Sequence, residues 1–473
     1  MKLAYTNFLE KGARSFSSIA AAIRREIYFN YLSLRGSSIP RYYQQALKAD
    51  AHGTPINCTQ QLLIRLLSHC QRAVPYYSPI IDKLGDRFQE DPFRYLLQFP
   101  ILTKAVIRKY FDQLKSADLA TRKWHFNTSG GSTGEPILLI QDREYLDRTI
   151  AISRLYSKWA GCDVGDAEVY IWGSEQEILA GQKGWKAYLM EWLINSKCLN
   201  AFCMTPEKMQ AFINLLNTKP PKLIVAYAQA IYELARFAER ERLPVRKQGA
   251  IQTSAGTLYP FMREKIEAVF KCKVFNRYGS REVSLIAGQC CESAGLHVPP
   301  QGNYVEVVDE EGRPLPPGED GNILVTCLTN FAMPLIRYQI GDRGKLATQA
   351  CHCGRQGQIL EKVMGRNVDA FQRKDGTLVD GEYFTHLLYF KDWIWKFQVI
   401  QKDLSLIIYK IIKSDLDYKE AELVEIAAKT RLLMGSDCRV LFEFVNQLPP
   451  SRSGKYRYTI SEVSGDISKA VYV

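Results

Sequence analysis

A run of small and hydroxyl-bearing residues, NTSGGSTGEP at positions 127–136, is the segment of the sequence that says most about chemistry. Glycine lets the backbone wrap closely around an anion, and consecutive amide N–H groups, together with Ser and Thr hydroxyls, can donate hydrogen bonds to phosphate oxygens. The run lacks the Gly-Lys-Ser/Thr end of the Walker loop, so it does not indicate a P-loop NTPase. It predicts a phosphate-binding loop of another class, and the alternative is a flexible Ser/Gly loop.

Three later segments could complete a nucleotide site. In NRYGSRE, the ring of Tyr278 could stack on a purine, and the carboxylate of Glu282 could hold a magnesium ion that bridges phosphates. Asp342 follows the turn of PLIRYQIGD and could accept hydrogen bonds from both ribose hydroxyls. Lys455 in SRSGK lies on a small-residue loop, where its ammonium could reach an α-phosphate. Taken singly, each signal is weak, since a hairpin Gly-Asp and a solvated surface lysine are common.

A second group of residues could bind a metal. Cys290 and His297 form a C-x6-H pair, and Cys351 and Cys353 form a C-H-C pair. Three thiolates and an imidazole suit tetrahedral zinc if the two pairs meet in the fold. Such a site would be structural, because four protein ligands leave no open position for chemistry. Two neighbours compete as ligands, Cys291 and His352, and the alternative is a set of unpaired, partly buried thiols.

Length and composition limit the class of protein. At 473 residues, the chain is long enough for two or three domains. Hydrophobic residues at 46% and charged residues at 24% are typical of folded globular chains and argue against disorder. No uninterrupted apolar run approaches the roughly 18 residues that a membrane-spanning helix needs. The N-terminal stretch MKLAYTNFLEKGARSF has no sustained apolar core, so a secretion signal is not expected and the predicted location is the cytoplasm.

Cysteine usage and charge add to this picture. The 12 cysteines are scattered, which argues against a secreted disulfide framework. The formal charge of +12 is dispersed without a basic run, so a solvated basic surface is the simplest interpretation. No nucleic-acid partner is expected. Contact with a membrane surface or a biosynthetic complex, and the oligomeric state, remain open.

The elements that position these motifs follow from periodicity. Residues 1–120 are predicted to be a mainly helical lead-in, and residues 121–367 a nucleotide-binding core in which strands alternate with helices. That alternation predicts parallel strands with crossover helices, and hence the α/β class. The segment YVEVVDEEGRPLPPGEDGNILVTCL predicts an antiparallel hairpin. Residues 368–473 are predicted to form a small α+β domain, with a strand in DLSLIIYKII, a helix in YKEAELVEIAAKTRLLMG and a strand in CRVLFEFV.

The four nucleotide segments in this order resemble the adenylate-forming superfamily of acyl-CoA synthetases, adenylation domains and luciferases. The sequence most closely resembles its phenylacetate-CoA ligase-like branch, which includes coenzyme F390 synthetases and ligase-like proteins of capsular polysaccharide clusters. The resemblance extends from about residue 70, through VPYY and FPILTK, to Lys455 and the following YRYTIS. It implies a large N-terminal adenylate-forming domain with mixed sheets and helices, followed by a small mobile C-terminal domain.

The resemblance also implies roles for individual residues. It makes Lys455 the catalytic lysine and Glu282 the magnesium ligand, and both would act with loop hydroxyls such as that of Thr133. These groups would neutralise charge while a carboxylate attacks the α-phosphorus of ATP and pyrophosphate leaves. Gly256 stands where relatives often have an acidic residue, and Val368 replaces the first acid of the hinge pair. The residues expected to contact the nucleotide are Ser129, Gly130, Gly131, Ser132, Thr133, Gly134, Ala255, Gly256, Tyr278, Gly279, Ser280, Asp342 and Arg366.

The sequence therefore predicts an ATP-dependent, AMP-forming ligase that activates a small-molecule carboxylate as an acyl-adenylate. The acyl group would pass to CoA or another nucleophile, and resemblance suggests polysaccharide-linked biosynthesis. The cofactors would be ATP, Mg²⁺, CoA and a structural Zn²⁺. Trp172 and Tyr227 are candidates for the acceptor pocket, although aromatics there are more often core residues. Two alternatives stay open: a nucleotidyl transferase that leaves AMP on a hydroxyl, and a nucleotide-binding scaffold without turnover.

Overall fold

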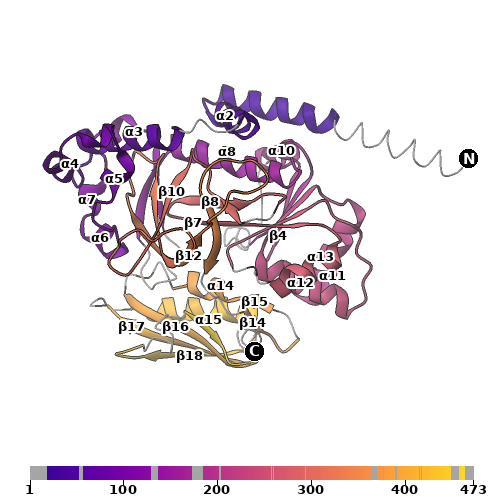
Figure 1. The fold of residues 1–473 in the computed structure, drawn as a ribbon. Coiled ribbons are helices and arrows are strands. Elements are labelled where there is room, and N and C mark those ends of the chain that lie inside the picture. The colour runs from indigo at the N-terminus through magenta and orange to yellow at the C-terminus, as the bar shows by residue number, and fades with distance from the viewer. Residues whose placement is uncertain are drawn as a thin grey trace, which may run out of the picture.

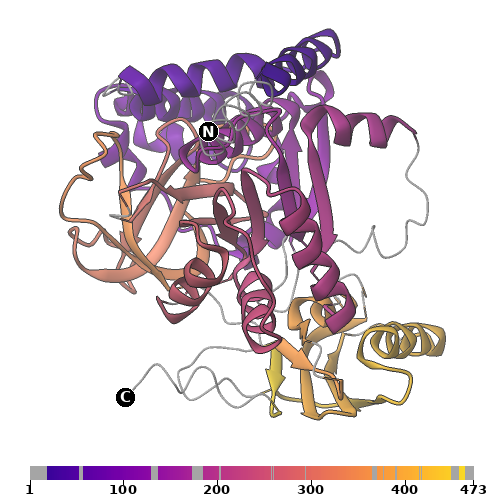
Figure 2. The same cartoon turned by 90° about the vertical axis from the view of Figure 1, so that its right-hand side faces the viewer.

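The computed structural model describes residues 19–52, 57–128, 137–172, 185–201, 204–256, 258, 260–292, 295–364, 370–375, 378–388, 391, 393–414, 416, 418–448 and 458–463. The chain has a large N-terminal part and a small C-terminal part, coloured yellow, which lies at the opposite end of the molecule from the indigo N-terminal helices in both views (Figure 1 and Figure 2). Among the described residues, no helix combines the length and the apolar character needed to span a bilayer.

An 11-stranded sheet forms the centre of the large part, in the order β10-β11-β12-β13-β9-β8-β7-β6-β5-β3-β4. The strands from β4 to β7 run parallel, and those from β7 to β10 run antiparallel to their neighbours. The strands are β3 (Glu168–Trp172), β4 (Ser196–Asn200), β5 (Leu223–Tyr227), β6 (Ile251–Ser254), β7 (Val274–Ser280), β8 (Ser284–Gln289), β9 (Leu296–His297), β10 (Asn303–Val308), β11 (Asp320–Cys327), β12 (Tyr338–Leu346) and β13 (Ile359–Met364). The predicted α/β class is confirmed, and β10 and β11 form the predicted hairpin.

Burial explains the parallel half of this sheet. Every residue of β5 is buried, as expected for a central parallel strand covered on both faces. The crossover helices are α11 (Pro206–Thr218), α12 (Ala228–Arg240) and α13 (Pro260–Phe270). In α12, Ile231, Leu234 and Ala238 recur at helical spacing and are buried against the sheet.

The helices before the sheet cover its antiparallel half. They are α2 (Ile39–His52), α3 (Cys58–Ala73), α4 (Ser78–Leu84), α5 (Pro92–Leu96), α6 (Lys104–Lys109) and α7 (Phe111–Leu114), and α8 (Arg143–Trp159) follows the first hairpin. Leu63, Leu66 and Leu67 of α3 are fully buried in the same cluster as Ile323 and Val325 of β11. Helix α3 therefore shares a core with the sheet, whereas Ile39 and Tyr43 of α2 pack in a separate cluster with Ala151 of α8.

The C-terminal part contains a four-stranded sheet in the order β18-β17-β16-β19 and a small two-stranded sheet. Its elements are β14 (Ala370–Gln372), β15 (Leu378–Asp380), α14 (Gly381–His386), β16 (Ile394–Asp403), β17 (Leu406–Lys413), α15 (Glu420–Met434), β18 (Arg439–Phe444) and β19 (Thr459–Ser461). The structure confirms the predicted strand–helix–strand order of β17, α15 and β18. One buried cluster joins Phe371 and Phe384 here to Ile231 of α12, so the two parts pack together. The boundaries after residues 120 and 367 remain predictions.

Candidate active site

The predicted purine-stacking and ribose-binding residues meet directly in the structure. The Tyr278 hydroxyl donates a hydrogen bond to Oδ2 of Asp342 at 2.7 Å, although β7 and β12 are separated by three other strands of the sheet. Gly279 follows Tyr278 at a point where a Cβ would come 2.4 Å from the carbonyl oxygen of Ser284, so only glycine fits this β7–β8 turn. A ring and a carboxylate are thus held side by side on a rigid sheet.

The strands that flank the predicted phosphate loop form a short hairpin beside Arg281 and Glu282. Its strands β1 (Trp124–Thr128) and β2 (Leu138–Asp142) flank the loop, and residues 129–136 lie outside the described residues. Asn127 donates hydrogen bonds to Gln141 Oε1 at 2.9 Å and to the carbonyl of Arg281 at 3.2 Å. Gln141 Nε2 also donates to the Arg281 carbonyl, at 3.1 Å. The two strands that flank the loop therefore lie beside Arg281 and Glu282. No role was predicted for Gln141 from the sequence.

Glu282 is buried, with 5% of its surface exposed, and has two close partners. The Tyr338 hydroxyl donates to its Oε1 at 3.3 Å, and the ammonium of Lys104 lies 3.7 Å from the same oxygen. Lys104 is positioned by Leu102, which forms a parallel bridge with Tyr338 at the start of β12. The segment FPILTK belongs to the stretch that resembles the family, but no role was predicted for Lys104. Lys104 directly follows Thr103, whose side chain caps the start of α6. A Thr at such a helix start is a pattern that the sequence itself shows.

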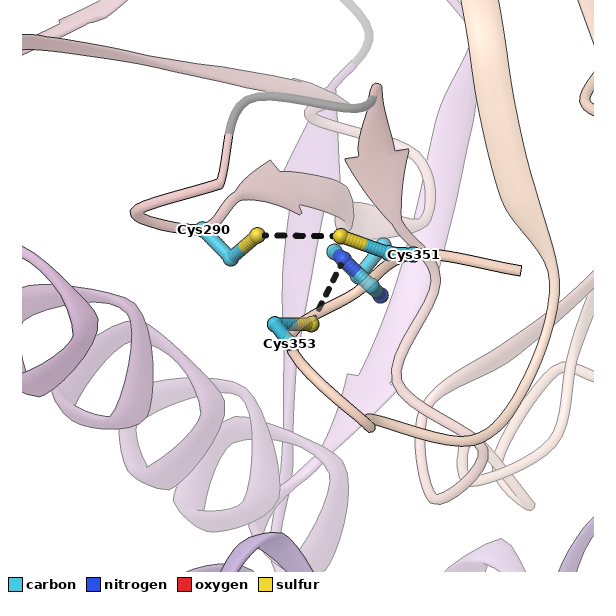
Figure 3. A group of neighbouring side chains, drawn as sticks. Cys290, Cys351 and Cys353 are labelled. Atoms are coloured by element: carbon cyan, nitrogen blue, oxygen red, sulfur yellow. Dashed lines mark hydrogen bonds between the residues drawn. The ribbon is translucent and has the colours of Figure 1, made fainter. Parts of the chain in front are cut away.

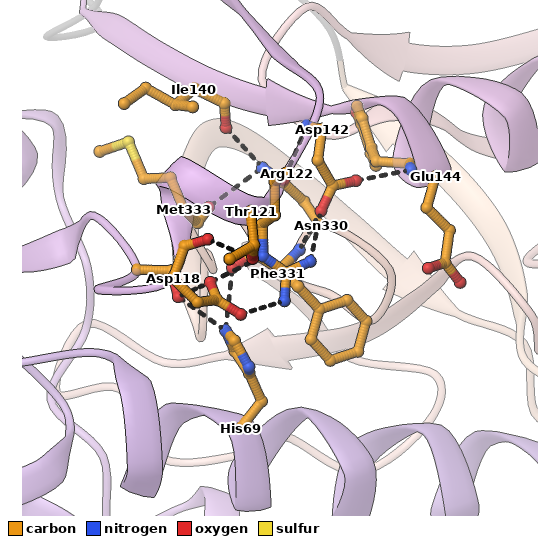
Figure 4. Close-up of polar contacts among 12 residues, drawn as sticks. His69, Asp118, Thr121, Arg122, Ile140, Asp142, Glu144, Asn330, Phe331 and Met333 are labelled. Atoms are coloured by element: carbon orange, nitrogen blue, oxygen red, sulfur yellow. Dashed lines mark hydrogen bonds and ion pairs between the residues drawn. The ribbon is translucent and has the colours of Figure 1, made fainter.

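An ion-pair network fixes both ends of the hairpin (Figure 4). Arg122, just before β1, donates two hydrogen bonds of 2.7 Å to Asp118 and one of 3.2 Å to Asp142, the last residue of β2. Asp142 also caps α8 by accepting from the Tyr145 amide at 2.8 Å. Hydrogen bonds from Arg122 lower the pKa of Asp118 to about 2, whereas burial raises the pKa of Asp142. The Arg122–Asp142 ion pair therefore joins the start of β1 to the end of β2.

Aromatic residues and a cation gather on the other face of β7. The rings of Trp172 and Tyr227 lie 4.2 Å apart, and the Arg277 guanidinium lies 5.7 Å from the Trp172 ring. Arg277 donates to Gln252 Oε1 at 3.3 Å, and its buried Nε has no partner among the described residues. The sequence reading did not single out Arg277, although its place directly before Tyr278 puts it on the opposite face of the strand.

Some predicted contact residues are exposed or lie outside the described residues. Ala255 has a φ of 61° and Gly256 follows it; both are exposed at the end of β6, which is a place where a backbone can approach a ligand closely. Ser280 ends β7 and is half-buried. The predicted residues outside the described part of the chain are Ser129, Gly130, Gly131, Ser132, Thr133, Gly134, Arg366 and Lys455.

The cysteine and histidine residues form a second, separate site (Figure 3). The ligand atoms of Cys290, His297, Cys351 and Cys353 all lie within 4.8 Å of one another. Cys290 Sγ is 3.6 Å from Cys351 Sγ, and Cys353 Sγ is 3.4 Å from His297 Nε2. Burial lowers the pKa of His297 to about 4, so the imidazole is neutral at pH 7. The fold thus brings together Cys290 and Cys351, which are 61 residues apart in the sequence.

Comparisons with known proteins agree with the motifs. Residues 371–462 match the model of the CapK C-terminal domain. The CapK protein of Staphylococcus aureus is 24% identical over 456 residues, which cover 95% of this chain and 97% of that protein. The phenylacetate-coenzyme A ligase of Escherichia coli strain K12 is 25% identical over 313 residues, which cover 64% of this chain and 69% of that protein.

A similar fold is found among solved structures. A 2-hydroxyisobutyryl-CoA ligase in complex with 2-HIB-AMP and CoA matches with a TM-score of 0.55 at 17% identity, covering 86% of this chain and 91% of that one. The chain is therefore homologous to CapK and to the phenylacetate-CoA ligases, and it has the fold of the adenylate-forming superfamily. The resemblance predicted from the motifs is confirmed.

Proposed function

From this homology, we propose that the chain is an ATP-dependent, AMP-forming ligase that activates a carboxylate as an acyl-adenylate and transfers the acyl group to CoA. The observation that supports this most is the 2.7 Å hydrogen bond between Tyr278 and Asp342. It joins an aromatic platform for a purine to an acceptor for ribose hydroxyls, which is the pair of contacts that an adenosine needs.

The remaining groups supply the charge balance of the proposed reaction. Asn127 and Gln141, in the strands that flank the loop, both donate to the Arg281 carbonyl. This supports the proposal that the hydroxyls of Ser129–Gly134, including that of Thr133, contact phosphates beside the Glu282 carboxylate. Glu282 would hold the magnesium of MgATP, and Lys455 would bring a positive charge to the α-phosphate. Tyr338 and Lys104 hold the Glu282 carboxylate in place from one side. An ionised carboxylate needs no general base to attack phosphorus, so none is invoked.

The face of β7 opposite Tyr278 suggests the chemistry of the acid. Tyr227 is buried in the hydrophobic core and Trp172 is partly buried against it. The Arg277 guanidinium lies near the Trp172 ring, and its buried Nε has no partner among the described residues. We therefore propose a substrate that carries a second anionic or strongly polar group besides the reacting carboxylate. Arg277→Met should raise KM for such an acid about tenfold or more, because charge-assisted hydrogen bonds contribute about 1.5–3 kcal/mol each. An equal KM for mono- and dicarboxylic acids in the wild type would contradict this assignment.

The test of the proposed function is pyrophosphate release across a panel of carboxylic acids, with and without CoA. The panel should include aryl acids, short hydroxy acids and sugar-derived acids, the last because resemblance suggests polysaccharide-linked biosynthesis. We expect acid-dependent pyrophosphate release and, with CoA, free AMP and a thioester. Retention of AMP on a hydroxyl acceptor would identify a nucleotidyl transferase instead, and ATP binding without any release would identify a scaffold.

A further inference from the structure

We propose that Cys290, His297, Cys351 and Cys353 bind a zinc ion, and that this ion holds the turn carrying Arg355 against helices α2 and α8. Three thiolates and one imidazole form a tetrahedral set that strongly favours Zn²⁺ over hard cations such as Mg²⁺. The site contains no carboxylate and no open position, so its role is structural. It lies apart from the nucleotide residues and does not depend on the proposed function.

Two of the six distances between the ligand atoms are close to the edges of a zinc tetrahedron. With Zn–S bonds of about 2.3 Å and a Zn–N bond of about 2.0 Å, two sulfurs lie about 3.8 Å apart, and a sulfur and a nitrogen about 3.5 Å apart. The observed separations are 3.6 Å for Cys290 Sγ to Cys351 Sγ and 3.4 Å for Cys353 Sγ to His297 Nε2. The other four pairs of ligand atoms also lie within 4.8 Å of one another.

The sheet topology explains why residues so far apart in sequence meet. His297 ends β9, a two-residue strand that pairs with β8 on one side and with β13 on the other. Cys290 directly follows β8, and Cys351 and Cys353 lie in the loop between β12 and β13. All four ligands therefore come from one end of three adjacent strands.

The competing ligands lie away from the cluster. Cys291 is exposed, and its thiol contacts the neighbouring Glu292 carboxylate at 3.5 Å. His352 is exposed, although it lies between Cys351, which is buried, and Cys353, which is half-buried. Both residues are therefore natural controls for the ligands beside them.

Surrounding contacts extend the proposed role of the ion. Arg355, two residues after Cys353, donates to both carboxylate oxygens of Asp50 in α2, at 2.6 and 3.2 Å, and stacks 4.5 Å from the ring centre of Trp159 in α8. Trp159 in turn donates to Asp50 at 3.1 Å. His297 lines a cavity of about 30 Å³ beside Asp50 and Arg355. Nδ1 of His297 is buried without a partner among the described residues, and this cavity is large enough for a water that would orient the ring, as ligand imidazoles require.

The experiment uses the full chain, purified with reductant and dialysed against buffer without added metal. We expect elemental analysis to find stoichiometric zinc, and replacement by Co²⁺ to give thiolate-to-cobalt charge-transfer bands with tetrahedral d–d absorption. Removal of the metal by a chelator should make amide hydrogen exchange in α2 several-fold faster and leave α15 unchanged. A protein without zinc, or one isolated with a disulfide between Cys290 and Cys351, would overturn the site.

Variants separate the ligands from their neighbours. Cys353→Ser should lower the bound zinc to a small fraction of the wild-type amount, whereas Cys291→Ser and His352→Ala should retain it fully. Equal zinc loss in Cys353→Ser and Cys291→Ser would refute the ligand assignment. If Cys353→Ser does not fold, the cobalt spectrum of the wild type decides, since absent charge-transfer bands exclude thiolate ligands. Unchanged exchange in α2 after metal removal would refute the role given to Arg355.

Discussion

Substitution of Arg122 by Met tests whether the ion-pair network stabilises the β1–β2 hairpin, which flanks the predicted phosphate loop. Arg122 is 22% exposed and Asp142 only 3%, and their charged atoms lie 3.2 Å apart. The attraction is about 5 kcal/mol at an effective dielectric constant of about 20. Removing one partner of a buried pair typically costs about 3–5 kcal/mol, because the remaining charge stays buried. Asp142 keeps its hydrogen bonds from the Tyr145 and Phe331 amides, so we expect the lower end, about 3 kcal/mol.

The assay is thermal unfolding of the full chain followed by circular dichroism. A loss of about 3 kcal/mol should lower the midpoint of the large part by about 6 °C, since large domains shift by about 2 °C for each kcal/mol. The matched control is Arg313→Met, which breaks an ion pair with Asp309 in which the arginine is 73% exposed, and should change the midpoint by less than about 1 °C.

A double variant identifies the cause of that loss. Asn at position 142 can still cap α8 through its side-chain oxygen, but it carries no charge. Arg122→Met combined with Asp142→Asn should therefore recover about half of the loss caused by Arg122→Met alone. The reasoning would be refuted if the double variant were no more stable than Arg122→Met, or if Arg122→Met and Arg313→Met had the same midpoint.

The remaining predictions concern the nucleotide site and acid stability. Tyr278→Ala should weaken ATP binding about tenfold, because stacking contributes about 1–3 kcal/mol, while Tyr278→Phe should retain most of the ATP affinity. Calorimetry with MgATP measures both affinities, and an equal affinity of the wild type and Tyr278→Ala would exclude the stacking role. Lys455→Ala should abolish pyrophosphate release yet leave ATP binding nearly intact, and undiminished turnover would exclude Lys455 from the chemistry. The pKa of Asp118 falls from 3.8 to about 2 on folding, mainly through hydrogen bonds from Arg122, so it contributes stability above pH 3.8 that is lost as the pH falls towards 2. The stability gap between the wild type and Asp118→Asn should accordingly narrow over that range in urea titrations, and a gap that widens there would contradict the assignment.

The sequence predicted the α/β class, the β10–β11 hairpin and the β17–α15–β18 order because each has a clear hydrophobic period bounded by turn residues. It also grouped Tyr278 with Asp342 and Cys290 with Cys351, since the residue types themselves suggest a shared ligand. It could not predict that β8, β9 and β13 are neighbours, because β9 has only two residues and no period to recognise. Side chains such as Lys104 were missed because their partners are distant in sequence and only the folded sheet brings them close.

The two-residue strand β9 lies between β8 and β13 in the central sheet. It is the narrowest hydrogen-bonded link between the parallel half, whose last strand carries Tyr278, and the antiparallel strands, one of which carries Asp342. Sliding of one half of the sheet past the other at β9 would separate the Tyr278 ring from the Asp342 carboxylate, which are proposed to bind one adenosine. The cysteine and histidine side chains lie beside β9, so a zinc ion bound there would also limit movement between the two halves of the sheet and keep Tyr278 close to Asp342.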